Sequence, residues 1–181
     1  MWSREIWSPR VDLGCGAGVP STALLAKRHR VIGIDISARQ LRLARDRVPT
    51  ALLVRADFSE LALAAGRADA VTAFYSMGHV PRRLHAGVLA EVFQALRPGG
   101  WLLTTMSVSG TEDNVQADFL GVPMFFSGFD AETNKTLILK AGFRIDTADA
   151  VSMHEPEGEA RFLWVLAQRP PTDDFCPSWT S

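Results

Sequence analysis

The chain has 181 residues, of which 47% are hydrophobic and 22% are charged, and its formal net charge is −1. This length suits one α/β domain, and the near-neutral charge argues against nucleic acid as the main partner, since phosphate binding favours a basic chain. Two cysteines are too few for a disulfide framework or a cysteine-rich zinc site, and no metal-ligand spacing appears. No stretch approaches the roughly 20 apolar residues of a membrane-spanning helix, and no signal peptide pattern is present, so we expect a soluble, cytoplasmic protein.

The first predicted strand covers residues 11–13 and follows a short lead-in, residues 1–9. It ends in a turn with glycine at alternate positions: Gly14, Gly16 and Gly18. Pro20 then fits the first turn of a short helix. Without Cβ atoms the turn lets backbone N–H groups approach a ligand, and the helix N-terminus favours a negatively charged group. This stretch predicts a nucleotide-type cofactor site at the carboxyl end of a parallel strand. The alternative is a tight turn without a ligand.

The glycine spacing distinguishes two kinds of cofactor site. The dinucleotide fingerprint G-x-G-x-x-G would require glycine where Val19 stands. The observed pattern is acid-x-G-x-G-x-G, with Asp12 two residues before Gly14. This pattern resembles motif I of the class I S-adenosylmethionine-dependent methyltransferases, in which the glycines would admit the methionine moiety and Asp12 would interact near its amino group. Cys15, inside the loop, is expected to pack as a small side chain.

Acidic residues also follow the second and third predicted strands, residues 31–35 and 51–55. The second strand is a continuous apolar run that ends in Asp35, which can accept hydrogen bonds from both ribose hydroxyls of an adenosine. Residues 56–58 resemble the family's third motif. The resemblance implies that Asp57 bonds the adenine amino group and that the backbone after it flanks the adenine ring. Asp57 could instead cap the turn that follows.

The fourth predicted strand, residues 68–75, brings two aromatic residues to the same edge of the sheet. Asp69 begins this strand at the opposite end and is expected to be structural. Phe74 and Tyr75 lie at the carboxyl end and face the cofactor and the substrate. Amino-group DNA and protein-glutamine methyltransferases carry an Asn/Asp-Pro-Pro-aromatic signature at this point, and residues 74–77 lack it. This difference counts against N-methylation of nucleobases.

A histidine follows directly after this strand. The stretch Gly78-His79-Val80-Pro81 resembles a turn of many small-molecule methyltransferases. A neutral His79 imidazole could accept a proton from a substrate hydroxyl or amine. Alternatively, His79 only packs on the cofactor or hydrogen-bonds to it, because methyl transfer often needs little beyond alignment.

The C-terminal half completes the predicted sheet. We expect, in order, a helix (82–97), a fifth strand (101–106), a helix capped by Asp130 (131–141), a sixth strand from residue 143 and a seventh (161–167). Residues 107–128 are the least regular part, and we interpret them as a loop that closes over the site. In this loop, Phe125 either lines a substrate pocket or covers the sheet edge. Residues 170–181 are predicted to be a disordered tail.

Together these elements predict one Rossmann-like, doubly wound α/β domain over residues 1–169. The resemblance implies seven strands in the order 3-2-1-4-5-7-6, with strand 7 antiparallel. It also implies a cofactor site with these members: Asp12, Gly14, Cys15, Gly16, Gly18, Asp35, Ile36, Ala56, Asp57, Phe58 and Phe74. Substrate contacts are expected from Tyr75, His79 and Phe125.

The resemblance implies an enzyme that transfers a methyl group from S-adenosylmethionine to a small molecule by in-line displacement. Such an enzyme needs no metal, nucleic acid or membrane partner, and it could form a homodimer. Two alternatives remain. The helices that usually precede the first strand in this family are largely missing from the lead-in, which favours a non-catalytic, cofactor-binding subunit of a larger assembly. A nicotinamide-dependent oxidoreductase has a similar fold, but Val19 argues against it.

Overall fold

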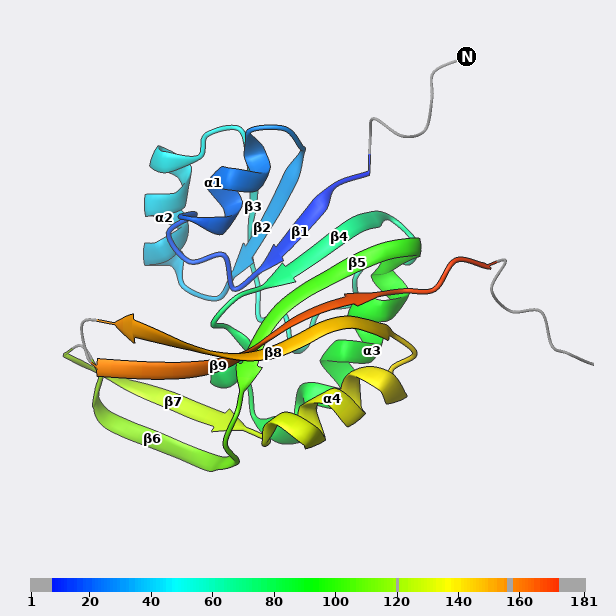
Figure 1. The fold of residues 1–181 in the computed structure, drawn as a ribbon. Coiled ribbons are helices and arrows are strands. Elements are labelled where there is room, and N and C mark those ends of the chain that lie inside the picture. Colours follow the sequence, from blue (N-terminus) through cyan, green and yellow to red (C-terminus); the bar gives the residue numbers. More distant parts are fainter. Residues whose placement is uncertain (1–7, 120, 156–157, 173–181) are drawn as a thin grey trace, which may run out of the picture.

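The computed structural model describes residues 8–119, 121–155 and 158–172, which form a central seven-stranded sheet (Figure 1). Its strands are β1 (Arg10–Leu13), β2 (Val31–Asp35), β3 (Leu52–Arg55), β4 (Ala68–Ala73), β5 (Leu96–Ser107), β8 (Arg144–Glu155) and β9 (Gly158–Gln168). They lie in the order β3-β2-β1-β4-β5-β9-β8. The strands from β3 to β5 are parallel, and β9 is antiparallel to both β5 and β8. The predicted Rossmann-like α/β architecture is confirmed.

Four α-helices join or flank these strands: α1 (Ser21–Ala26), α2 (Ala38–Arg47), α3 (His85–Ala95) and α4 (Ala131–Lys140). In Figure 1, α1 and α2 lie beside the half of the sheet that contains β1, β2 and β3, whereas α3 and α4 pack below the other half. Right-handed crossovers explain this separation, because the chain moves from β1 toward β3 and later from β4 toward β5 in opposite directions. The order reverses between β1 and β4, and ligands of such sheets bind outside the carboxyl ends of the strands at that point.

The central strands form because their apolar side chains are buried between the helices. Val71 of β4 and Leu102 of β5 are buried in the middle of the sheet, and Leu163 of β9 joins them at the antiparallel edge. Below the sheet, Ile138 of α4 is fully buried and belongs to the same core cluster. One continuous hydrophobic core therefore stabilises the sheet and the position of the carboxyl ends of its strands.

The interpretation of residues 107–128 as an irregular loop is wrong. They contain an antiparallel hairpin of β6 (Thr111–Phe119) and β7 (Val122–Gly128), which forms a separate two-stranded sheet. A period-2 signal was present, because Val115, Ala117 and Phe119 alternate with polar residues before the turn at Gly121. The two additional strands change the strand numbers, so the predicted order 3-2-1-4-5-7-6 is corrected to 3-2-1-4-5-9-8.

Three element boundaries also differ from the prediction. The helix predicted over residues 82–97 consists of a 3₁₀ turn (Arg82–Leu84) followed by α3. The fifth strand begins earlier, because Leu96 already pairs with Ala68 and the register then shifts before Trp101. The fourth strand ends at Ala73, two residues before the predicted end. In contrast, the predicted cap of α4 is confirmed, since Asp130 Oδ1 accepts a hydrogen bond of 2.8 Å from the Thr133 N–H.

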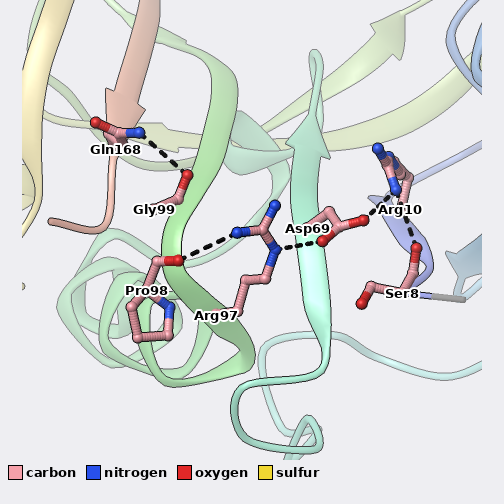
Figure 2. Close-up of polar contacts among 7 residues, drawn as sticks. All are labelled: Ser8, Arg10, Asp69, Arg97, Pro98, Gly99 and Gln168. Carbon is pink, nitrogen blue, oxygen red and sulfur yellow. Dashed lines mark hydrogen bonds and ion pairs between the residues drawn. The ribbon is translucent and has the colours of Figure 1, made fainter. Parts of the chain in front are cut away.

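At the amino end of β4, Asp69 joins three strands through ion pairs (Figure 2). Its Oδ2 pairs with Arg10 of β1 and its Oδ1 pairs with Arg97 of β5, while Arg10 also donates a hydrogen bond of 3.0 Å to the Ser8 carbonyl. The Asp69 side chain is only 10% exposed. These contacts confirm the structural role predicted for Asp69, at the end of the sheet opposite to the candidate site.

Some predictions concern residues outside the described ranges. Most of the predicted lead-in (residues 1–7) and most of the predicted tail (residues 173–181, including Cys176) lie there. Within the described ranges, no helix has both the length and the hydropathy required to cross a membrane.

Candidate active site

The glycine-rich loop between β1 and α1 uses its three glycines for different purposes. All have positive φ, namely 69° at Gly14, 55° at Gly16 and 81° at Gly18, which L side chains rarely adopt. A Cβ at Gly14 would collide with Ser76, and one at Gly18 would lie 3.2 Å from the Ala44 side chain of α2. A Cβ at Gly16 would meet no atom within 4 Å. Gly16 therefore leaves open space for a ligand, whereas Gly14 and Gly18 allow the loop to pack closely on its neighbours.

Asp35, the last residue of β2, connects that strand to the glycine loop. Its Oδ2 accepts a hydrogen bond of 2.8 Å from the Gly16 N–H, and its Oδ1 accepts one of 2.8 Å from the Ser37 N–H. A carboxylate has about four acceptor positions, so both oxygens can still accept hydroxyl donors. The residue is half-buried and remains accessible. Asp35 thus fits the expected role toward a ribose.

The location of Asp12 differs from the expectation that it interacts near the amino group of a cofactor. Asp12 is only 1% exposed. Its Oδ2 accepts hydrogen bonds from the hydroxyls of Ser21 (2.7 Å) and Thr22 (2.6 Å), and its Oδ1 accepts one from Thr72 (2.7 Å). These hydroxyls belong to α1 and β4, so one carboxylate fixes β1 to both neighbouring elements through charge-assisted bonds. Asp12 therefore supports the glycine loop as a buried residue.

Cys15 is buried under the same loop. It is 5% exposed, and a Cβ added to Gly33 of β2 would lie 2.9 Å from its Sγ. Burial, followed by the negative charges of Asp12 and Asp35, raises the pKa of the Cys15 thiol to about 12. The thiol therefore stays protonated at neutral pH and is a poor nucleophile. Its contacts are those of the expected small packing group.

The residues expected around an adenine lie beside the ends of β2 and β3. Ile36 is 65% exposed, and the Ala56 N–H donates a hydrogen bond of 3.1 Å to the Asp35 carbonyl. The Asp57 Oδ1 accepts hydrogen bonds from the N–H and the hydroxyl of Ser59. Asp57 thus caps the following turn, which was the alternative interpretation, and its Oδ2 has no partner among the described residues. Phe58 is half-buried and packs partly against the core.

Two aromatic residues after β4 reach toward β9. Tyr75 has φ 55°, unusual for a residue other than glycine, and its N–H donates a hydrogen bond of 2.7 Å to Thr105 Oγ1. The Tyr75 ring lies edge-on to Phe162 at 4.9 Å between centroids. The Phe74 ring lies 5.4 Å from Trp164. Phe74 therefore packs against Trp164 of β9, while Tyr75 contacts Phe162, which is closer to the end of β5.

A cavity of about 280 Å³ lies between this turn, the end of β5, the β6–β7 hairpin and β9. In Figure 1 the hairpin lies beside the end of the β8–β9 ribbon that projects beyond β5. The residues that line the cavity are Tyr75, Gly78, His79, Thr105, Met106, Ser107, Thr111, Phe119, Phe126, Ser127, Arg161 and Phe162. Tyr75 and His79 were predicted as substrate contacts, and both line this cavity. Phe125 does not line it, and the adjacent Phe126 does.

Most of the cavity wall was not identified from the sequence. Phe119 and Phe126 belong to the hairpin that was interpreted as a loop, so their alternation with polar residues was the available signal. Arg161 and Phe162 belong to the last strand, and no local pattern distinguishes them from other strand residues. They reach the cavity because β9 returns antiparallel beside β5, with Phe162 opposite Ser107.

His79 is held in one orientation on the cavity wall. Its Nδ1 lies 2.8 Å from the Phe125 carbonyl oxygen, and its ring lies 5.1 Å from that of Phe126. A carbonyl oxygen can only accept, so Nδ1 carries the proton in this bond, and the lone pair of a neutral ring is on Nε2. Nε2 has no hydrogen-bond partner among the described residues. The hairpin thus fixes the tautomer that can accept a proton.

His85, at the start of α3, has a different environment. It is 2% exposed, its Nε2 lies 3.0 Å from the Val80 carbonyl, and its Nδ1 has no partner among the described residues. Burial lowers the pKa of His85 below its usual value. The neutral ring supports the turn that carries His79, with Phe129 edge-on at 6.0 Å between centroids.

A parallel sheet that closes on an antiparallel β9, with a glycine loop joined to an acid at the end of β2, has the architecture of the class I S-adenosylmethionine-dependent methyltransferases. Residues 11–100 match a family model described as a methyltransferase domain. This part of the chain therefore belongs to that methyltransferase family, whose class I members use S-adenosylmethionine as the methyl donor.

Individual relatives agree with this assignment. A trans-aconitate 2-methyltransferase from Paracidovorax citrulli is 45% identical over 100 residues, which cover 53% of this chain and 37% of the relative. A ubiquinone biosynthesis O-methyltransferase from Leptothrix cholodnii is 32% identical over 98 residues, which cover 51% of this chain and 41% of the relative. The alignments thus cover less than half the length of these curated relatives.

Solved structures extend the similarity to nearly the whole chain. A S-adenosylmethionine-dependent methyltransferase from Methanosarcina mazei has a TM-score of 0.78 at 19% identity, with 92% of this chain and 94% of that chain covered. A second one, from Mesorhizobium loti, has a TM-score of 0.71 at 21% identity, with 92% and 94% covered. At these identities the similarity shows a shared fold.

Proposed function

We propose that this chain transfers a methyl group from S-adenosylmethionine to a small-molecule acceptor. The observation that carries this proposal is the contact between the cofactor loop and the cavity wall. Gly14 packs so closely on Ser76 that a Cβ would not fit, and Ser76 directly follows Tyr75, which lines the cavity. The Ser76 hydroxyl also donates a hydrogen bond of 2.9 Å to the Leu13 carbonyl. A donor on the loop and an acceptor in the cavity would therefore be neighbours.

The residues present fit the cofactor. Open space at Gly16 admits a ligand close to the backbone, and Asp35 has acceptor capacity for ribose hydroxyls. The free Oδ2 of Asp57, the exposed Ile36 and the half-buried Phe58 would contact the adenine. We assign Asp12, Cys15, Gly14, Gly18, Ala56 and Phe74 to the support of these contacts rather than to the contacts themselves. When bound, S-adenosylmethionine supplies an electrophilic methyl group on its sulfonium.

The side chains of this protein would align the acceptor and accept its proton. Tyr75 and the aromatic wall would hold the acceptor and exclude water from the cavity. His79 Nε2 would accept the proton of an acceptor hydroxyl or amine, because its Nδ1 is engaged with the Phe125 carbonyl. Most of the rate enhancement would come from alignment, since the cofactor carries the reactive bond. The names of the relatives, which refer to trans-aconitate and to ubiquinone biosynthesis, support a small-molecule acceptor.

Calorimetric titration of the chain with S-adenosylhomocysteine tests the cofactor site, with NAD as a parallel titrant. We expect micromolar binding of S-adenosylhomocysteine and none of NAD. Incubation with methyl-labelled S-adenosylmethionine and an acceptor panel then tests turnover. Binding without labelled product on any acceptor would favour the alternative of a non-catalytic cofactor-binding subunit. Absence of binding would contradict the proposal.

Further proposals concern location and assembly. We propose a cytoplasmic enzyme without a nucleic acid or membrane partner, because the charge balance is near neutral and the cavity suits a small molecule. A homodimer is a separate proposal. Sedimentation of the full chain would test it, and a mass that corresponds to one chain at micromolar concentration would contradict it.

A further inference from the structure

The acceptor cavity contains one feature that methyl transfer alone does not require. Its walls are aromatic, with Tyr75 and Phe162 on one side and Phe119 and Phe126 on the other. Among the residues that line it, the single arginine is Arg161, and none is a lysine, an aspartate or a glutamate. An apolar cavity with one guanidinium at its edge favours a ligand with an apolar body and one negative group.

The position of Arg161 follows from the topology. β9 pairs with β5 from Trp101 to Ser107, and Ser107 is opposite Phe162. Arg161 is the next residue outward, so it lies just beyond the end of β5, where β9 pairs only with β8 at Ser152. The cavity lining includes residues of β9 and of the β6–β7 hairpin. In Figure 1 this hairpin lies beside the projecting end of the β8–β9 ribbon. Arg161 therefore lies at the outer end of the cavity, at the end opposite to the sheet core.

The charges around the cavity leave this guanidinium available. Within residues 8–119, 121–155 and 158–172, no hydrogen bond or ion pair to the Arg161 side chain is found. The acidic residues of the hairpin have partners of their own: Glu112 pairs with Arg82, Asp113 accepts from Ser127 and Asp118 accepts from the Gly121 N–H. Among the described residues, none of these three acidic side chains pairs with Arg161, and the charge of Glu112 is compensated by Arg82.

We propose that the acceptor is a small organic acid, whose carboxylate pairs with Arg161 while its apolar or conjugated body lies between the two aromatic walls. This inference rests on the proposed function and specifies its substrate class. A carboxylate matches the planar guanidinium in a two-pronged, charge-assisted pair. A phosphate ester is less suitable, because its charge of nearly −2 exceeds the single positive charge that Arg161 brings to the cavity lining.

Paired probes test this assignment in the presence of saturating S-adenosylhomocysteine. The probes are sodium benzoate against benzamide and sodium cinnamate against cinnamamide, with phenyl phosphate as the alternative anion. Calorimetry on the full chain should show each carboxylate binding at least tenfold more tightly than its amide. Arg161→Gln should remove this preference, Arg161→Lys should retain part of it, and Arg28→Gln should leave it unchanged, since Arg28 is exposed and follows α1.

The outcomes separate this inference from the proposed function. Retained S-adenosylhomocysteine binding by Arg161→Gln would show an intact fold and cofactor site. Equal binding of acid and amide, failure of both to bind, or a preference that survives Arg161→Gln would overturn the carboxylate assignment. Tighter binding of phenyl phosphate than of benzoate would overturn it in favour of a phosphate ester. If the unmodified chain does not bind S-adenosylhomocysteine, that result would instead contradict the proposed function.

Discussion

The backbone N–H of Gly16 donates a hydrogen bond of 2.8 Å to Oδ2 of Asp35. This bond joins the glycine loop after β1 to the end of β2 and orients the carboxylate beside the open space at Gly16. The same side chain is thus expected to organise the loop and to bind the ribose hydroxyls. Both functions depend on the negative charge of the carboxylate, which strengthens each hydrogen bond that it accepts.

We therefore expect Asp35→Asn to weaken S-adenosylhomocysteine binding by about tenfold or more, since a hydrogen bond to a charged group contributes about 1.5–3 kcal/mol. Asp46→Asn on α2 is the matched control, because Asp46 is exposed and has no hydrogen bond or ion pair among the described residues. Calorimetry measures both. Equal affinity of the Asp35 variant and the unmodified chain would show that the ribose does not bind there.

The His79→Asn variant tests whether His79 acts as a base or only as a packing residue. Asparagine can still donate a hydrogen bond to the Phe125 carbonyl, but it has no counterpart of Nε2. With an acceptor found by screening, we expect turnover to fall by about 100-fold or more, while S-adenosylhomocysteine affinity stays unchanged. If His79→Asn retains full turnover and His79→Ala does not, the residue acts only through its contact with the hairpin.

The buried Asp12 carboxylate should depend on its hydroxyl donors for stability. Thr72→Val removes the 2.7 Å bond to Asp12 Oδ1 without a change in shape, and we expect the free energy of unfolding to fall by about 2 kcal/mol. Thr72→Ser retains the hydroxyl and loses one buried methyl group, for an expected loss of about 1 kcal/mol. Denaturant unfolding compares the two variants. A valine variant more stable than the serine variant would contradict this role.

Because His85 is buried, we expect the stability of the folded chain to depend on pH. Burial lowers the pKa of His85, so below its ordinary value of about 6.5 the unfolded chain binds a proton that the folded chain resists. The stabilising effect of the neutral ring is present above about pH 6.5 and is lost as the pH falls toward the lowered value. Thermal unfolding between pH 5 and 7.5 should show a flatter profile for His85→Gln than for His29→Gln, in which the exposed His29 is replaced. Identical profiles would show that His85 titrates normally in the folded chain.

The sequence by itself was sufficient to predict the central sheet and the proposed cofactor site. The acidic residue and glycines around Gly16 are contiguous, and Asp35 ends an apolar strand, so local pattern was sufficient to predict their positions. The same local view placed Asp12 in contact with the cofactor, because a pattern cannot show that three hydroxyls from α1 and β4 enclose its carboxylate.

The candidate acceptor cavity could be located only from the tertiary structure. Its walls come from segments that are far apart in the chain, and Tyr75, Phe126 and Phe162 meet there because β9 returns antiparallel beside β5 and the β6–β7 hairpin folds against it. Strand pairing over such separations depends on the whole core and not on a local motif, so neither Arg161 nor the fixed tautomer of His79 could be predicted. The proposed cofactor site therefore depends mostly on contiguous residues, whereas the candidate acceptor cavity forms only after the chain has folded.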